Sequence, residues 1–339
     1  MTKPPTIADI AKRAGLSKGA VSYALNGRPG VSEATRQRVL KLAAEMNWHP
    51  NSAARALSGA RAGAVGLALA RPASVLGIEP FFMRLISGIE TALSAASVAL
   101  HLQIVSDHEA EIAIYRRWWA EQRIDGAFIA DLWVGDSRLP VLEQLDLPAV
   151  IIGGPAERST LPGVWVDDSA GMAMIVEYLA ALGHRRLAHV SGLPSMLHTQ
   201  QRQAAFDAAV ARLGLDEPAG MSTDYSAEQS SQVTRRLLSL TPRPTAIIYD
   251  NDVMAVAGTS VAHEMGVDVP GQVSIVAWED SVLCHIVHPP LSALSRDVVA
   301  HGARAAEHLL AKIGGEDVDD YQVDTPALVT RGSTGRAPR

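Results

Sequence analysis

The first fifty residues carry apolar positions at the spacing of short helices. Thr6 followed by Asp9 is typical of a capping box, in which two side chains satisfy free backbone amides at a helix start. The apolar positions that follow recur every three or four residues, as one buried helical face requires. They are Ile7, Ile10, Ala11 and Ala14. The pattern predicts a first helix that ends at Gly15.

Two more helices are predicted before residue 50. Ser17 and Ser32 are preferred N-cap residues, and Asn26 with Gly27 stops the helix that begins at Ser17. The inward positions of this second helix are Ala20, Val21, Ala24 and Leu25, and its outward positions are Lys18, Gly19, Ser22 and Tyr23. The buried stripe of the third helix is predicted at Val39, Leu40, Ala43 and Met46, with Arg36, Arg38 and Lys41 on or near its wet side.

Short helices joined by a glycine-containing turn, with a third helix closing the core, match the helix-turn-helix motif. In that motif the second helix enters the major groove of DNA with its N-terminal side chains at the base edges. The sequence therefore predicts an all-α DNA-binding head over residues 1–50.

Residues 51–63 have the features of a short helix followed by a tether. Asn51 can cap a helix that runs through three alanines and Leu57 to Ser58, and a glycine-containing stretch follows. A helix this short falls below the ~12 to 15 residues that persist alone in water. We expect this hinge helix and linker to fold when it binds a partner.

Beyond residue 63, short apolar runs alternate with amphipathic stretches. The runs predict buried parallel strands at 64–70, 100–105, 126–129, 149–152, 187–190, 246–248 and 273–278. The stretches predict helices at 82–97, 109–122, 169–182, 201–213, 227–240 and 251–265. This alternation is typical of doubly wound α/β layers. More than 260 residues is generous for one sheet, so we expect two similar lobes.

Doubly wound sheets bind ligands outside the carboxyl ends of their strands, and two lobes that face each other form a cleft for a small molecule. The loops at those ends are 71–82, 106–107, 130–133, 153–154, 191–202, 250–252 and 278–281. Neutral polyols are held by planar charged groups beside an aromatic ring. The candidates for effector binding in these loops are Phe81, Asp131, Arg202, Asp252, Trp278 and Glu279. The alternatives are a core strand aromatic for Trp278, a helix cap for Asp252 and a solvated charge for Arg202.

The charge of the chain is unevenly distributed. Residues 1–60 hold nine lysines and arginines against three acidic residues, a balance of +6, whereas the whole chain has a formal net charge of −6. The rest of the chain therefore carries −12. A basic head on an acidic body suggests that the head meets a polyanion.

The composition excludes several protein classes. Hydrophobic residues make up 47% of the 339 residues, which is ordinary globular usage and excludes a disordered chain. One cysteine, Cys284, excludes an internal disulfide framework and a thiolate zinc cluster. Charged residues interrupt the N-terminus and the most apolar windows, so we expect no signal peptide, no membrane partner and a cytoplasmic location. No cofactor and no metal site are predicted.

An enzyme is the second class to weigh. The predicted loops contain His198, Asp131, Asp136 and Asp250, which could perform acid–base chemistry. His108-Glu109 and His263-Glu264 resemble the start of a zinc-binding helix, but Ile112 and Val267 stand where the second histidine is needed. Neither a nucleophile elbow nor a phosphate-binding loop is present, so no catalytic residue is predicted. A transport-linked binding protein is a third class, which leaves the basic head unexplained.

The head resembles the DNA-binding head of the LacI family of bacterial transcription regulators, nearly position for position. The matching run is TIADIAKRAGLSKGAVSYALNGRPGVSEATRQRVLKLAAEMNWHPNSAARAL. The likeness weakens through the body and returns at PTAIIYDNDVMAVAG, VPGQVSIVAWED, PPLSALSRD and LVTRGST. It covers essentially the whole chain.

The resemblance implies DNA-contacting residues in the head. Bases are expected to be read by Lys18, Gly19 and Tyr23, and backbone phosphates to be held by Ser17, Ser22, Asn26 and Thr35. Thr6 and Arg36 complete the candidates in the head. Tyr23 stands where arginine is common in the family, and a phenol cannot make the bidentate hydrogen bond to guanine that a guanidinium makes. Alternatively, Tyr23 packs against the edge of the third helix.

For the hinge segment, the resemblance implies pairing with its twin in the minor groove across a dimer. Leu57 occupies the place of the leucine that wedges open the central base step, and Asn51 and Ala54 are further candidates for DNA contact. An ordinary core leucine in a linker helix is the alternative for Leu57.

For the body, the resemblance implies a type-I periplasmic-binding-protein-like fold whose chain crosses between the lobes three times. The predicted effector-binding and dimerisation domain spans 64–339, with a first lobe at about 64–160 and 292–315 and a second lobe at about 161–291 and 316–339. The crossings are expected near 153–165, 289–294 and 314–323. Dimerisation is expected through first-lobe surfaces such as the helix from Phe82 onward.

Two of the candidate effector residues match family positions directly. Arg202 aligns with an arginine that contacts effector hydroxyls, and Asp252 aligns with an effector-binding aspartate. Glu279 replaces the usual aspartate, and its extra methylene displaces the carboxylate, so the effector need not be the usual sugar of any family member.

The resemblance therefore implies a homodimeric repressor of carbohydrate-utilisation genes. It would bind a pseudo-palindromic double-stranded operator, with an affinity controlled by a small-molecule effector, a sugar, between the lobes. A non-sugar metabolite such as a nucleobase is the alternative effector.

Overall fold

The computed structural model describes residues 5–48, 61–72, 76–156 and 159–338. The chain forms two compact units, Met1–Ala62 and Gly63–Arg339, here called the head and the body. The predicted hinge helix 51–58, with its candidates Asn51, Ala54 and Leu57, lies outside the described residues.

The head contains the predicted helices α1 (Ile7–Ala14), α2 (Lys18–Leu25) and α3 (Glu33–Glu45). The capping box forms as expected: the Asp9 amide donates to Thr6 Oγ1, and Asp9 Oδ2 accepts from the Thr6 amide. The buried core of the head consists of Ile10, Ala11, Val21, Ala24, Val39 and Ala43. The prediction that Leu40 is buried is wrong, because its side chain is 41% exposed. It lies one residue, about 100° of helical turn, from the face that Val39 and Ala43 share.

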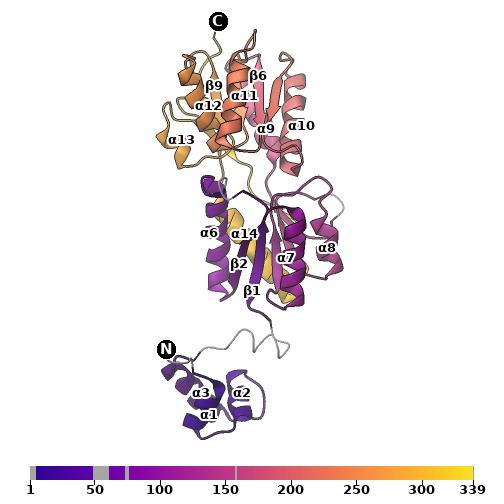
Figure 1. Ribbon diagram of the computed structural model, residues 1–339, viewed down its shortest axis with the longest axis vertical. Helices are drawn as coiled ribbons and strands as arrows, with labels where there is room; N and C mark the ends of the chain where they lie inside the picture. The colour runs from indigo at the N-terminus through magenta and orange to yellow at the C-terminus, as the bar shows by residue number, and fades with distance from the viewer. Residues whose placement is uncertain (1–4, 49–60, 73–75, 157–158, 339) are drawn as a thin grey trace. The chain divides into compact units, whose positions relative to one another are not determined.

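The first lobe of the body is built on a parallel sheet covered by helices, drawn in purple to magenta in Figure 1 except for the C-terminal helix α14, which is yellow. Within the described residues its strand order is β11-β5-β4-β3-β1-β2. The strands are β1 (Ala64–Leu69), β2 (Ala99–Ile104), β3 (Gly126–Ile129), β4 (Ala149–Ile152), β5 (Gly163–Trp165) and β11 (Tyr321–Gln322). The helices are α6 (Pro80–Ala95), α7 (His108–Ala120), α8 (Arg138–Gln144) and α14 (Val298–Gly314).

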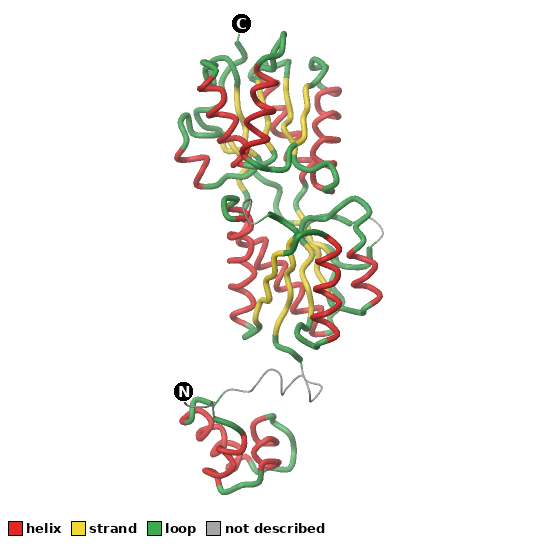
Figure 2. Tube along the Cα trace, viewed as in Figure 1, coloured by secondary structure: helices red, strands yellow, loops and turns green. Residues whose placement is uncertain are grey.

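The second lobe repeats this plan, and Figure 2 shows strands between helical layers in both lobes. Its described strands run in the order β12-β10-β9-β8-β6-β7, all parallel except β12. The strands are β6 (Leu187–Ser191), β7 (Ala219–Ser222), β8 (Ala246–Tyr249), β9 (Ser274–Ala277), β10 (Ser292–Ser295) and β12 (Ala327–Val329). The helices are α9 (Asp168–Ala181), α10 (Leu197–Arg212), α11 (Ala227–Leu238), α12 (Asp252–Glu264) and α13 (Val282–Ile286).

The chain passes between the lobes at different residues from those expected. Strand β5 pairs with β4, and β11 pairs with β5, so residues 163–165 and 321–322 belong to the first lobe. Strand β10 pairs with β9 and belongs to the second lobe. In the described chain the crossings therefore follow β5, β10 and β11. These strands were not predicted, because two to four residues carry too little periodicity to be recognised.

Helix α14 returns from the second lobe and packs against α6 of the first. Their backbones approach closely: a methyl group at Gly88 would lie 2.0 Å from the Val299 carbonyl oxygen, and one at Gly302 would lie 2.2 Å from the Leu85 carbonyl oxygen. Glycine is required at both positions of this crossing. In the described chain, no helix combines the length and apolar character needed to cross a bilayer.

Candidate functional site

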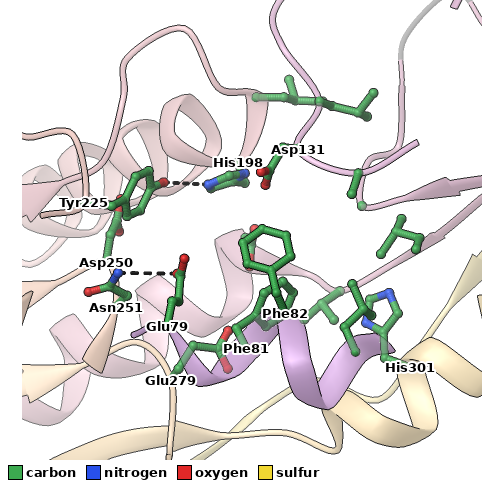
Figure 3. Close-up of a pocket in the computed structure, with 18 of the residues that line it drawn as sticks. Glu79, Phe81, Phe82, Asp131, His198, Tyr225, Asp250, Asn251, Glu279 and His301 are labelled. Atoms are coloured by element: carbon green, nitrogen blue, oxygen red, sulfur yellow. Dashed lines mark hydrogen bonds between the residues drawn. The ribbon is translucent and has the colours of Figure 1, made fainter. Parts of the chain in front are cut away.

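A cleft lies where the carboxyl ends of the two sheets face each other. It has a volume of about 820 Å³, its open mouth included. Its walls come largely from residues that directly follow strands, such as Arg71 after β1, Asp131 after β3 and Asp250 after β8. Figure 3 shows the side chains that line it. Four of the predicted effector residues line this cleft: Phe81, Asp131, Arg202 and Glu279.

Arg202 projects from α10 into the cleft and is held by long contacts. Its Nη1 donates to the Asp250 carbonyl oxygen at 3.2 Å, and its Nη2 lies 3.5 Å from Asp168 Oδ1. Its Nε is buried and has no partner among the described residues. The guanidinium carbon lies 3.9 Å from the centre of the Trp278 ring. The guanidinium group of Arg202 is therefore held in place while one of its N–H groups has no acceptor among the described residues. The alternative of a solvated charge does not hold, because Arg202 is 6% exposed.

Trp278 does not line the cleft, which corrects its prediction as an effector-binding residue. It is 1% exposed and packs in the core of the second lobe with Phe206 and Val276. Its amide donates to the Tyr249 carbonyl oxygen at 2.9 Å, so the residue continues the ladder of β9. The alternative that Trp278 is a core strand aromatic is correct. Its ring packs against the guanidinium group of Arg202.

Asp252 is also absent from the cleft lining. It is the first residue of α12, and Asn251 before it caps the helix by accepting from the Met254 amide at 2.8 Å. Asp252 Oδ1 accepts from the Val253 amide, whereas Oδ2 is buried without a partner among the described residues. Burial raises the pKa of Asp252. The predicted role in effector binding is not supported by this position, because the residue is 1% exposed and does not line the cleft.

Two ion pairs hold carboxylates of the cleft in place. Asp131 Oδ2 accepts from Arg71 Nε at 2.7 Å. Burial alone would raise the pKa of Asp131, but the charge and hydrogen bond of Arg71 outweigh it and lower that pKa. Glu279 pairs with Arg296, whose guanidinium lies 5.1 Å from the centre of the Phe81 ring. Arg71 and Arg296 were not predicted, although Arg71 lies within a predicted loop.

The cleft is also lined by polar residues that the sequence analysis did not name as effector contacts. A hydrogen bond of 2.6 Å joins His198 Nε2 to the Tyr225 hydroxyl oxygen (Figure 3). Burial, with the nearby charge of Arg202, lowers the pKa of His198 to about 4. Burial likewise lowers the pKa of His301 to about 4. Both imidazoles are therefore neutral at pH 7 and add no positive charge to the cleft.

Asp250 is the most firmly held carboxylate of the cleft. Its Oδ1 lies 2.9 Å from His189 Nε2, and its Oδ2 accepts from the Gly192 amide at 2.9 Å. Burial opposes ionisation, but the charges of His189 and Arg202 outweigh it and hold the pKa of Asp250 well below its usual range.

The charges of the lining do not balance. The carboxylates are Glu79, Asp131, Asp168, Asp250 and Glu279, and the arginines are Arg71, Arg202 and Arg296. Carboxylates therefore outnumber guanidinium groups by two. Among the described residues, no three side chains of histidine, cysteine, aspartate or glutamate are arranged to hold a metal ion.

The outward face of the head begins at the first turn of α2. Ser17 caps this helix by accepting from the Ala20 amide at 3.1 Å, and Lys18 and Gly19 follow it fully at the surface. Tyr23 is 45% exposed. A methyl group at Gly30 would lie 3.5 Å from Tyr23 Cδ2, so the ring rests beside the loop before α3. Its phenol edge remains accessible.

The other candidates in the head are engaged in local contacts. Asn26 Nδ2 donates to the Ser22 carbonyl oxygen at 2.9 Å, and Thr35 Oγ1 lies 2.9 Å from Ser32 Oγ. Arg36 is partly buried and donates from Nη2 to the Arg28 carbonyl oxygen at 3.0 Å. Arg36 therefore ties α3 to the loop before it, which the sequence did not predict.

Comparison with known proteins matches both units. Residues 6–51 match the family of bacterial regulatory proteins called the lacI family, and residues 176–334 match the periplasmic binding protein-like domain. The transcriptional regulator reg1 of Streptomyces lividans is 31% identical over 98% of this chain and 97% of its own length. A crystal structure of the lac repressor dimer bound to operator and the anti-inducer ONPF is 26% identical, with a TM-score of 0.86 over 98% of this chain and all of that chain.

A structure of the regulator CelR in complex with cellobiose is 25% identical, with a TM-score of 0.74 over 97% of this chain and 99% of that chain. A helix-turn-helix head joined to a periplasmic-binding-protein-like body defines a DNA-binding transcriptional regulator rather than an enzyme. The chain belongs to the LacI family of bacterial transcriptional regulators.

Proposed function

We propose that the protein is a homodimeric repressor whose affinity for a pseudo-palindromic operator is controlled by a sugar bound in the cleft. The observation that carries the proposal is the unsaturated arginine of the cleft. Arg202 keeps a buried Nε without a partner in the described chain, and planar donors of this kind suit vicinal hydroxyls. The likeness to CelR, solved with cellobiose, supports a sugar as the effector. The repressed genes would be those of carbohydrate utilisation.

The proposed effector contacts are the predicted residues that line the cleft. Arg202 and Glu279 present planar charged groups to hydroxyls, Asp131 does so from the first lobe, and Phe81 offers a ring face. Trp278 is left out of this set because it supports Arg202 from the core. Asp252 is left out because it is buried and does not line the cleft.

The proposed DNA contacts are those of the second helix of the head and its neighbours. Lys18, Gly19 and Tyr23 would read bases, because they lie on the exposed first turns of α2. Phosphates would be held by Thr6, Ser17, Ser22, Asn26, Thr35 and Arg36. The hinge contacts Asn51, Ala54 and Leu57 are proposed from the sequence alone.

Dimerisation is proposed through exposed apolar side chains on one side of the body. Met83 on α6 is 63% exposed, and Ile286 on α13 is 72% exposed. Ile78 and Val282 lie beside them in sequence and are similarly exposed. Figure 1 draws α6 and α13 on the same side of the body, and Arg84 Nη1 donates to the Asp280 carbonyl oxygen between them. Exposed apolar side chains gathered on one side of a protein are typical of an interface.

Effector and operator would then influence each other through the dimer. An effector that changes the closure of the lobes would move the two linkers and so favour or disfavour paired hinge helices. By thermodynamic linkage, DNA must change effector affinity by the same factor, typically equivalent to ~1 to 3 kcal/mol.

The proposal is tested by measuring which genomic fragments the full chain binds, with and without a panel of mono- and disaccharides. We expect one fragment class to bind with steep salt dependence, and one sugar to change that affinity. Lys18→Ala should relax sequence preference more than Arg36→Ala, because base contacts specify and phosphate contacts position. Arg116→Ala, an exposed arginine of the body, is the control.

Two results would contradict different parts of the proposal, the base reader Lys18 and the sugar effector. Equal weakening of cognate and random duplex by Lys18→Ala would remove Lys18 as a base reader. Selective DNA binding that no sugar alters would leave the regulator in place and remove the sugar.

A further inference from the structure

Glu79 is a buried carboxyl group that performs none of the local roles open to it. It occupies the N-cap position of α6, directly before Pro80, yet its side chain makes no capping hydrogen bond. Asp, Asn, Ser and Thr cap helices with short side chains, and a residue before proline is held in an extended conformation. The longer side chain of Glu79 therefore leaves the helix terminus and lines the cleft.

The carboxyl group of Glu79 is nearly without hydrogen bonds. The residue is 7% exposed, its Oε1 lies 3.4 Å from Asn251 Nδ2, and its Oε2 is buried with no partner among the described residues. Figure 3 shows the group pointing into the cleft, with Asn251 at one oxygen. Buried polar oxygens without a partner are rare in folded proteins, and each one calls for a physical explanation.

The cations of the cleft are already paired with other carboxylates. Arg71 donates to Asp131, and Arg296 pairs with Glu279. Arg202 is shared between Asp168 and Asp250 at 3.5 and 3.6 Å. In the described part of the cleft, each of these guanidinium groups contacts another carboxylate, and none is hydrogen-bonded to Glu79.

Charges of both signs act on Glu79. Arg71 opposes the charge of Glu79, whereas Asp131 and Asp252 add to it. Burial dominates these effects and raises the pKa of Glu79 to about 7. The nearby imidazole of His198 is neutral at this pH, because its own pKa is lowered to about 4. A ligand with a hydrogen-bond donor at this position would give Glu79 Oε2 the partner that the described residues do not provide.

We propose that Glu79 is an effector contact that selects the ligand by charge: it accepts a hydrogen bond from a hydroxyl or ammonium group and excludes ligands that carry a carboxylate or phosphate there. This inference rests on the proposed effector function of the cleft. It narrows the ligand to an uncharged or cationic polyhydroxy compound. An anionic group beside Glu79 would place like charges within a few ångströms at low dielectric, where the arginines of the cleft already contact other carboxylates.

The test compares related ligands of different charge. Matched sets are measured by calorimetry and by thermal shift at pH 8.5, where Glu79 is ionised: a hexose, its 2-amino derivative, its uronate and its 6-phosphate, in the gluco, galacto and manno series. Hypoxanthine and inosine monophosphate form a further neutral and anionic pair, so the charge question does not depend on a sugar. We expect the neutral or cationic member of a binding set to bind at least about tenfold tighter than its anionic partner.

The variant arm assigns the selection to Glu79 itself. In Glu79→Gln the ratio between neutral and anionic affinities should fall at least about fivefold, because an uncharged amide no longer repels the anion. Glu90→Gln, which removes an exposed carboxylate from the same helix, is the matched control and should leave the ratio unchanged.

The outcomes separate this inference from the proposed function. A uronate, hexose phosphate or inosine monophosphate that binds as well as its neutral partner overturns charge selection and leaves the effector cleft in place. An unchanged ratio in Glu79→Gln overturns the role of Glu79. Selective binding of hypoxanthine alone supports charge selection and removes the sugar, and binding of no compound at all overturns both proposals. The ligand comparison on the unaltered protein stands even if Glu79→Gln does not fold.

Discussion

Two clusters of buried charge in the body are built in opposite ways. In the first lobe, Arg138 is 1% exposed and donates from Nη1 to Glu111 at 2.8 Å and from Nη2 to Asp136 at 2.7 Å. The same Nη2 also donates to the Asp131 carbonyl oxygen at 2.9 Å. We call Arg138, Glu111 and Asp136 the first-lobe cluster. The buried guanidinium has short bonds in several directions.

In the cleft, buried charged groups lie farther from their partners, and some of their polar atoms have no hydrogen-bond partner among the described residues. Arg202 reaches its partners at 3.2 to 3.6 Å, and its Nε and the Oε2 of Glu79 have no partner in the described chain. Fully satisfied networks fix a fold, whereas partly satisfied ones are costly unless something else completes them. The difference indicates that the first-lobe cluster serves the structure and the cleft is arranged for a ligand.

The largest effect is expected from breaking the satisfied cluster. Arg138→Met leaves Glu111 and Asp136 buried without their cation, which costs about 3–5 kcal/mol of unfolding free energy. Chemical denaturation of the body measures it. Arg123→Met, which breaks an exposed pair with Glu121 in the same lobe, should cost about 0–1 kcal/mol. Equal losses in the two variants would remove the distinction between paired interior charge and surface charge.

A smaller effect, on binding rather than on folding, is expected at Arg202. Arg202→Lys keeps a positive charge near Asp168 and Asp250 but loses the planar donors and the stacking on Trp278. We expect the effector concentration needed for half-maximal response to rise about 10- to 100-fold, equivalent to ~1.5 to 3 kcal/mol. Operator titration at increasing effector measures it.

The control for Arg202 lies on the same helix. Arg212→Lys changes an exposed arginine that pairs with Glu177 and should leave the response unchanged. Arg202→Lys could instead unfold the body, with no effector raising the melting temperature of either protein. Arg202 would then serve the structure, as Arg138 does, and would not distinguish the cleft from the first-lobe cluster.

The sequence predicts the fold of the described chain well because its local signals agree with one another. Thr6, Ser17 and Ser32 each cap the helix expected of them, and the apolar runs of the body form strands β1, β2, β3, β4, β6, β8 and β9. The short edge strands and the return of α14 to the first lobe depend on pairings distant in sequence, for which local periodicity gives no indication.

The cleft is predicted less completely, and for a physical reason. The rule that ligands lie beyond strand ends located the loops that hold Phe81, Asp131, Arg202 and Glu279. It cannot tell whether a side chain at a strand end faces the ligand or the core, which is why the prediction for Trp278 was wrong. It also misses Arg296 and His301, which reach the cleft after the crossing that follows β10.

The smallest effect, and the most specific, is a pH-dependent change in stability at Glu79. Burial raises the pKa of Glu79 to about 7 in the folded protein, whereas an unfolded chain has a glutamate pKa of about 4.3. Between these values the folded state holds a proton that the unfolded state lacks, so this group destabilises the fold progressively as pH rises. This loss of unfolding free energy reaches its full size above pH 7 and is absent below pH 4.

Glu79→Gln removes that titration, because the amide is neutral at every pH. At pH 4 the glutamate is neutral in the folded protein and mostly neutral in the unfolded chain, so the two proteins should melt at nearly the same temperature. At pH 8 we expect the variant to melt about 2–6 °C higher. Every other titrating group, including Arg71, Asp131 and Asp252 around the site, is present in both proteins, so the difference between the two melting curves isolates Glu79. A difference that is constant from pH 4 to pH 8 would mean that Glu79 is ionised throughout and has a partner, and the contrast with the first-lobe cluster would then rest on Arg202 alone.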